Sequence, residues 1–280
     1  MIIAVVGPTG VGKTKLSIEL AKKYNGIIIS VDATQIYKGL DIGSAKVTEK
    51  EKRGIKHYLL DIKNPDEDYS VADFQKDARK IIADNKDKNI ILVGGTGLYL
   101  KALLYDYHFQ KFKSVDYSKF SNEELLTMCQ KIDPNVDIHV NNRVRLENYL
   151  KREGKCEKSS KLLYDVKFIG LTTDRNILYD KINNRVDEMF KLGLVDEVKE
   201  LYNKYPNSKI LKRAIGYKEV IAYLKDELSL EETKDLIKKN SRHYAKRQYT
   251  WFNNQMPVKW FQTNYDNFNE TIKEVISYID

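Results

Sequence analysis

The sequence is poor in cysteine and proline: its 280 residues include only two cysteines, Cys129 and Cys156, and five prolines. Two cysteines this far apart exclude a disulfide framework and a CxxC-type zinc site, so we expect ordinary reduced thiols. The chain is also unlike a disordered tail, because 42% of its residues are hydrophobic and 31% are charged. Its length suffices to bury a core unaided, and we expect a monomer with no obligate protein partner.

Long apolar runs are absent as well. No segment approaches the roughly 20 apolar residues that a membrane-spanning helix needs. The first residues, MIIAVVGPTG, are a short apolar run that leads directly into a glycine-rich loop, which leaves no room for a cleavable signal peptide. We therefore expect a cytoplasmic protein with no membrane partner.

Short apolar runs alternate with helical patterns along most of the chain. The runs are rich in β-branched residues and suit the central strands of a parallel sheet; they cover residues 2–6, 27–31, 90–93 and 166–171. A helix is expected over 71–84, and another over 231–251. This alternation predicts an α/β fold, a P-loop NTPase-like parallel sheet core with helices on both faces.

Residues 105–165 break this alternation. They show no strong strand signal and contain two helix-compatible segments, 122–132 and 142–154. We expect a small inserted helical subdomain, with the α/β core formed by 1–104 and 166–280. Beyond the insertion, apolar residues at helical spacing predict one long amphipathic helix; they are Ile182, Val186, Met189, Val195, Val198 and Leu201.

One motif identifies a phosphate site. The pattern G-x-x-x-x-G-K-[ST] of nucleotide-binding and ATP-binding proteins is met between an expected strand and an expected helix; its residues are Gly7, Pro8, Thr9, Gly10, Val11, Gly12, Lys13 and Thr14. Backbone N–H groups and Lys13 would bind the phosphates, and the Thr14 hydroxyl could hold Mg²⁺. A purely structural turn would not need Lys-Thr at this spacing.

The phosphate site lacks a usual partner of nucleotide hydrolysis. An NTPase ordinarily has a carboxylate on a neighbouring strand, but the run 90–93 ends in Gly94, Gly95 and Thr96. A diphosphate that departs as a leaving group needs only charge neutralisation. The one carboxylate at a strand end near the P-loop is Asp32, which follows 27–31 at the edge where ligands bind. Its alternative role is a cap of the following turn.

All the charged residues of the segment 236–260 are basic. The segment has six basic residues and no Asp or Glu: Lys238, Lys239, Arg242, Lys246, Arg247 and Lys259. Aromatic residues are interleaved with them, a mixture that contacts phosphates and unpaired bases. A solvated helix face is the alternative interpretation.

Several motifs resemble those of the tRNA dimethylallyltransferases (tRNA isopentenyl transferases), in that family's order and over nearly the whole chain. They are SVDATQIYKGLDIGSAK from Ser30, GGTGLY from Gly94, RAIGYK from Arg213 and YAKRQ from Tyr244. The resemblance implies transfer of a dimethylallyl group from dimethylallyl diphosphate to the exocyclic amine of the adenosine 3′ of the anticodon. It also implies catalytic roles for Asp32 as general base, Arg213 and Lys13 on the diphosphate, and Thr96.

The resemblance further suggests contacts with the tRNA anticodon stem-loop. The candidates are Asp32, Ala33, Thr34, Gln35, Thr96, Arg143, Arg145, Tyr217, Arg242, Lys246, Arg247 and Gln248. Among them, Gln35 would read the edge of a flipped base. Thr96 could instead be a turn hydroxyl, and Arg143 an ordinary surface residue.

The sequence departs from the family's pattern at three points, and three other functions are alternatives to this interpretation. Ala33 stands where the family commonly has serine, the run 141–147 lacks one residue of the usual arginine pattern, and no C-terminal zinc finger is present, as in bacterial members. The nearest rival is an adenylate isopentenyltransferase acting on AMP, ADP or ATP. A P-loop kinase or a plain RNA-binding module would each explain only one of the two features, the P-loop or the basic segment.

Overall fold

The computed structural model describes residues 1–107, 109, 115–152 and 161–280, and Cys156 and the expected helix end at Gly154 lie outside them. The chain forms two compact units. Unit 1 comprises Met1–Leu104 and Leu163–Asp280, and unit 2 is Tyr105–Leu162. Among the described helices, none combines the length and apolar character that a membrane crossing demands.

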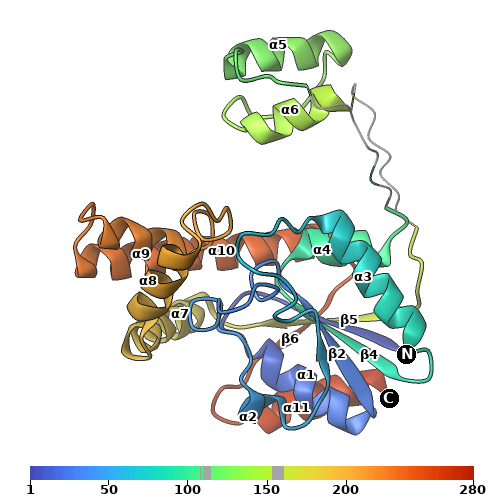
Figure 1. Ribbon diagram of the computed structural model, residues 1–280. Helices are drawn as coiled ribbons and strands as arrows, with labels where there is room; N and C mark the ends of the chain where they lie inside the picture. The colour runs from blue at the N-terminus through green and yellow to red at the C-terminus, as the bar shows by residue number, and fades with distance from the viewer. Residues whose placement is uncertain (108, 110–114, 153–160) are drawn as a thin grey trace. The chain divides into compact units, whose positions relative to one another are not determined.

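Unit 1 is built on a sheet of six parallel strands in the order β3-β2-β4-β1-β5-β6 (Figure 1). The strands are β1 (Ile2–Val6), β2 (Gly26–Val31), β3 (His57–Tyr58), β4 (Asn89–Gly94), β5 (Val166–Thr172) and β6 (Lys259–Gln262). The α/β fold class and the four central strands are therefore confirmed. The two edge strands were not predicted, because they are short and only partly buried.

Helices cover both faces of this sheet (Figure 1). On one face, α1 (Lys13–Lys23) and α11 (Phe268–Ile279) share a core with the strands. On the other lie α3 (Val71–Asp84) and α4 (Gly97–Leu104), which pack together through Phe74 and Tyr99. The remaining helices of unit 1 are α2 (Glu49–Lys52), α7 (Arg175–Lys191), α8 (Leu194–Lys204), α9 (Tyr217–Leu224) and α10 (Leu230–Gln255).

The long helix expected over Ile182 to Leu201 is wrong as a single element. The structure has two helices, α7 and α8, separated at Gly193. Gly193 is the N-cap of α8 and has φ of 98°, a left-handed conformation that a continuous helix does not contain. The apolar spacing continues across this break, which is why the periodicity alone did not reveal it.

Unit 2 contains α5 (Asn122–Ile132) and α6 (Arg143–Lys151). Their apolar faces bury Leu125, Cys129, Leu146 and Leu150 against one another. Asn142 begins α6 because its side-chain oxygen accepts a hydrogen bond from the backbone N–H of Arg145.

Candidate functional site

The P-loop lies between β1 and α1. Gly12 precedes the helix with φ of 89°, and a Cβ there would lie 2.6 Å from the Phe268 ring, so only glycine fits. Two side chains hold the loop from behind: Thr263 donates to the Val11 carbonyl and Tyr265 to the Gly10 carbonyl, each at 3.0 Å. The sequence analysis did not find these two supports.

A cavity of about 940 Å³ opens in front of the P-loop. The loops that follow β1, β2 and β4 reach it from the sheet, and α7, α10 and the segment before α9 close it. Lys13 and Asp32 both line this cavity. The predicted site residues that line it are Thr9, Gly10, Gly12, Lys13, Thr14, Asp32, Thr34, Gln35, Arg213, Arg247 and Gln248.

The remaining predicted site residues of unit 1 do not line the cavity. They are Gly7, Pro8, Val11, Ala33, Thr96, Tyr217, Arg242 and Lys246. Pro8 still serves the site, because its carbonyl accepts a hydrogen bond from Lys13 Nζ at 2.7 Å. Arg143 and Arg145 belong to unit 2.

The surroundings of Lys13 disfavour the charged form of its amine. Its burial lowers its pKa to about 7, the positive charge of Arg185 acts in the same direction, and Asp32 partly opposes both. A polyphosphate bound here would supply the missing counter-charge. The cavity is therefore suited to an anionic ligand.

Arg185 of α7 is a site residue that the sequence analysis missed. It lines the cavity, and its Nη1 donates to the Thr9 hydroxyl at 3.3 Å. Burial lowers its pKa, while Glu51 and Asp32 act to raise it. The sequence does carry a signal: Arg185 lies three residues after Ile182 and four before Met189, which places an arginine on the apolar stripe of an amphipathic helix.

Asp32 forms the turn cap that was its alternative role, and its role as general base stays a prediction. Its Oδ1 accepts hydrogen bonds from the backbone N–H groups of Thr34 at 2.8 Å and Gln35 at 3.2 Å, so it caps the turn after β2. Within the described residues, no hydrogen bond to Oδ2 is formed. One oxygen can therefore order the turn while the other faces a ligand.

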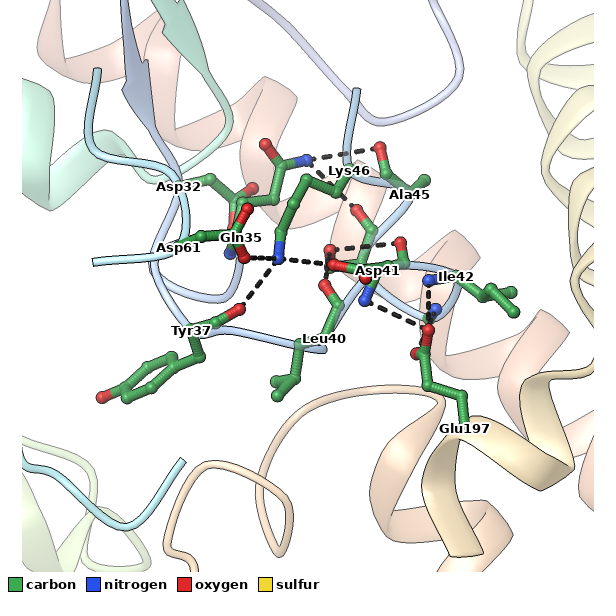
Figure 2. Close-up of polar contacts among 12 residues, drawn as sticks. Asp32, Gln35, Tyr37, Leu40, Asp41, Ile42, Ala45, Lys46, Asp61 and Glu197 are labelled. Atoms are coloured by element: carbon green, nitrogen blue, oxygen red, sulfur yellow. Dashed lines mark hydrogen bonds and ion pairs between the residues drawn. The ribbon is translucent and has the colours of Figure 1, made fainter. Parts of the chain in front are cut away.

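The side-chain amide of Gln35 is hydrogen-bonded within the protein at both ends. Its amide nitrogen donates to the carbonyls of Ser44 at 3.2 Å and Ala45 at 3.4 Å, as Figure 2 shows. Its amide oxygen accepts from the Ser30 hydroxyl at 3.3 Å. Gln35 still lines the cavity, but the donor and acceptor expected at a base edge are already engaged with the protein.

Thr96 makes a contact within the protein. Its hydroxyl accepts a hydrogen bond from the Ala33 N–H at 3.2 Å, so it connects the loops that follow β4 and β2. This contact fits the alternative of a turn hydroxyl, and the catalytic role of Thr96 stays a prediction.

Two residues expected to contact tRNA are buried. Tyr217 is 0% exposed and its hydroxyl donates to Glu197 at 2.7 Å. Gln248 is 5% exposed, and its amide bonds to the Thr9 N–H and the Gly95 carbonyl. Gln248 still lines the cavity, and the tRNA contacts expected of both residues stay predictions, because a motif shows that a residue is present but not which way its side chain faces.

The basic segment in α10 is only partly free to bind RNA. Lys238 forms an ion pair with Asp187 at 2.7 Å, and Arg242 donates to Asn183 at 2.6 Å. Both partners lie on α7, so they could not be recognised in the α10 sequence. Lys246 and Arg247 are exposed, and the Arg247 guanidinium lies 5.7 Å from the centre of the Tyr244 ring.

The two arginines of unit 2 differ from each other. Arg143 donates to the backbone carbonyls of Tyr117 and Phe120 and pairs with Glu147, so it stabilises the unit. Arg145 is exposed. Of the two, Arg145 is the better candidate for an RNA contact.

Arg213 lies in the turn before α9, where it is exposed and lines the cavity. Thr14 is also exposed at the cavity. The P-loop, Arg185 and Arg213 thus provide cations and N–H donors to the cavity, and the turn at Asp32 provides a carboxylate.

The chain is similar to a family of known enzymes over most of its length. The model of the IPP transferase family matches residues 35–255. The tRNA dimethylallyltransferase of Anoxybacillus flavithermus is 45% identical over 298 residues, covering 100% of this chain and 96% of the relative. That of Bacillus anthracis is 45% identical over 301 residues, covering 100% and 95%.

Solved structures are similar over the same length. A tRNA isopentenylpyrophosphate transferase from Bacillus halodurans has 41% identity and a TM-score of 0.80, covering 99% of this chain and 95% of that one. A eukaryotic dimethylallyltransferase acting on tRNA has 26% identity and a TM-score of 0.85, covering 99% and 77%. Since both the family model and full-length relatives match, this chain belongs to the IPP transferase family.

Proposed function

We propose that this protein transfers the dimethylallyl group of dimethylallyl diphosphate to the N6 amine of the adenosine 3′ of the anticodon in tRNA. One observation carries the proposal: Lys13 and Asp32 line the same cavity, in the segments that follow β1 and β2, two strands separated in the sheet by β4. A phosphate-binding cation and a carboxylate that can take a proton therefore lie within reach of one reaction centre. The extended similarity to tRNA dimethylallyltransferases supports this choice of donor and acceptor.

In the proposed reaction, the N6 nitrogen forms a bond to C1 of the dimethylallyl group as the bond from C1 to the diphosphate oxygen breaks. The diphosphate leaves with the electron pair. Lys13, Arg185 and Arg213 would neutralise its charge, together with the N–H groups of the P-loop. Asp32 would accept the proton that the amine loses.

Mg²⁺ fits this site as an ion that arrives with the diphosphate. Among the described residues, no cluster of three or more His, Cys, Asp or Glu side chains could hold a metal. The Thr14 hydroxyl is exposed at the cavity and can supply one oxygen ligand, and Mg²⁺ commonly takes its others from phosphate and water. When bound, the ion would offset part of the diphosphate charge.

The tRNA anticodon stem-loop is the proposed acceptor because exposed cations lie on α10, where Arg247 borders the cavity. A free mononucleotide, the substrate of an adenylate isopentenyltransferase, needs no such extended surface. A tRNA acceptor would place the reaction in the cytoplasm.

The direct test is transfer of labelled dimethylallyl diphosphate to tRNA from a strain that lacks the modification. We expect label in tRNA and none in AMP. A stem-loop with guanosine in place of the target adenosine is the matched control and should remain unlabelled. Transfer to AMP alone would establish the adenylate enzyme, and transfer of the γ-phosphate of ATP would indicate a kinase.

A further inference from the structure

Glu197 of α8 holds a loop beside the cavity without lining the cavity itself. Its carboxylate accepts backbone hydrogen bonds from Asp41 at 3.2 Å, Ile42 at 2.7 Å and Gly43 at 3.1 Å. Figure 2 shows Glu197 reaching this loop from a separate helix. Three consecutive N–H groups that converge on one anion form a nest, and the ionised carboxylate makes each hydrogen bond stronger.

Tyr217 completes the contacts of this carboxylate. Its hydroxyl donates to Glu197 at 2.7 Å, and its ring packs against Gly43 so closely that a Cβ there would lie 2.6 Å from the ring. Burial and the Glu197 charge raise the pKa of Tyr217, so the hydroxyl remains a donor at physiological pH. Glu197 of α8 and Tyr217 of α9 therefore both contact this loop.

The loop continues directly into the cavity wall. Gly43, Ser44 and Ala45 line the cavity, and the carbonyls of Ser44 and Ala45 hold the amide of Gln35. The N–H of Gln35 in turn donates to Asp32 Oδ1. A chain of hydrogen bonds and adjacent residues thus leads from Glu197 to the carboxylate at the reaction centre.

A second anchor fixes the far end of the loop. Lys46 Nζ donates to the Tyr37 carbonyl at 2.8 Å and to Asp41 Oδ1 at 2.7 Å, and it also contacts Asp61 (Figure 2). Its side chain is only 5% exposed. Lys46 therefore also holds Asp41, while Glu197 accepts the N–H groups of Ile42 and Gly43.

We propose that Glu197 is a positioning residue for the acceptor nucleoside, acting through Asp41–Gly43 on Gln35 and Asp32. The inference rests on the proposed function, since it takes the turn at Asp32 as the acceptor side of the cavity. The diphosphate side is held separately, by Thr263, Tyr265 and Gln248. Loss of the Glu197 charge should therefore affect the two substrates unequally.

The test compares Glu197→Gln with Glu200→Gln, an exposed control on the same helix. The carboxamide keeps the size of the side chain but cannot accept all four hydrogen bonds. We expect kcat/KM for tRNA to fall by about tenfold to a hundredfold, as for a small misplacement of reacting groups. The KM for dimethylallyl diphosphate should stay within about twofold of the wild type. Tyr217→Phe, which retains the ring, should give a smaller loss of the same kind.

Amide hydrogen exchange gives a second readout that does not depend on activity. Ile42 and Gly43 should lose protection in Glu197→Gln while the strands of the sheet keep theirs. Equal losses on both substrates, or unchanged kinetics, would overturn the role of Glu197. Failure of the wild-type chain to modify tRNA would instead overturn the proposed function.

Discussion

Gln248 accepts a hydrogen bond from the backbone N–H of Thr9 at 2.9 Å, which joins α10 to the P-loop. The other end of the same amide donates to the Gly95 carbonyl after β4 at 3.2 Å. The side chain is only 5% exposed, and these two contacts use both ends of its amide. Gln248 therefore connects α10, which carries the exposed cations, to the loop that would bind phosphate.

We predict that Gln248→Leu lowers the free energy of unfolding by about 1–3 kcal/mol, because it leaves the buried Gly95 carbonyl and the half-buried Thr9 N–H without partners. It should also raise the KM for dimethylallyl diphosphate, since the Thr9 turn loses its support. Denaturant unfolding and steady-state kinetics measure the two effects. Lys239→Leu, at an exposed position on the same helix, is the control and should change stability by less than about 0.5 kcal/mol.

Asp32→Asn separates the catalytic role of Asp32 from its capping role. An amide oxygen can still accept the N–H groups of Thr34 and Gln35, but the side chain cannot take a proton. We expect kcat to fall by about a hundredfold or more with little change in melting temperature. Asp32→Ala should lower both. If Asp32→Asn kept full turnover, Asp32 would be only a cap.

Arg185→Gln tests the cation that the sequence analysis missed. Removing it takes a positive charge from the diphosphate side of the cavity, so we expect a higher Kd for pyrophosphate by calorimetry. The pKa of Lys13 should rise at the same time, because Arg185 is one cause of its low value. Lys191→Gln, exposed on the same helix, should change neither quantity.

The pKa of about 7 for Lys13 predicts a pH-dependent affinity for diphosphate. Above pH 7, free Lys13 is increasingly neutral and must take up a proton when the anion binds. The affinity should therefore fall as pH rises from 7 to 9, by up to about tenfold per unit. Calorimetry in buffers of different ionisation enthalpy measures the proton uptake. Pyrophosphate itself titrates in this range, and Lys13→Met supplies that background; an equal slope in the variant would contradict the prediction.

The sequence was sufficient for the elements whose signals are local. The buried strand at Ile2–Val6 and the glycine pattern after it predicted both the central strand and the P-loop. Helix α3 was predicted at its observed bounds, and the structure shows that Ser70 and Asp73 form a capping box at its start. In each case the residues that decide the structure are neighbours in the chain.

The side-chain contacts that the sequence did not predict join residues that are far apart in the chain. Glu197 binds N–H groups more than 150 residues away, and Gln248 bonds to a residue 239 positions earlier. Neither contact leaves a local pattern. Tyr217 was assigned to tRNA because it belongs to a recognisable motif, although its ring is buried. Motif membership located the site but did not distinguish residues that support it from residues that face a ligand.

Arg247 is the exposed cation on α10 that also borders the cavity, and its test is the salt dependence of tRNA binding. Each phosphate contact releases counterions, so removing one should reduce the slope of log K against log salt by about 0.7 to 0.9. We expect this reduction for Arg247→Gln and none for Lys80→Gln, a control exposed on α3. Both slopes can be measured by filter binding with an anticodon stem-loop between about 50 and 200 mM salt. A slope unchanged by Arg247→Gln would mean that this face of α10 does not contact the RNA backbone.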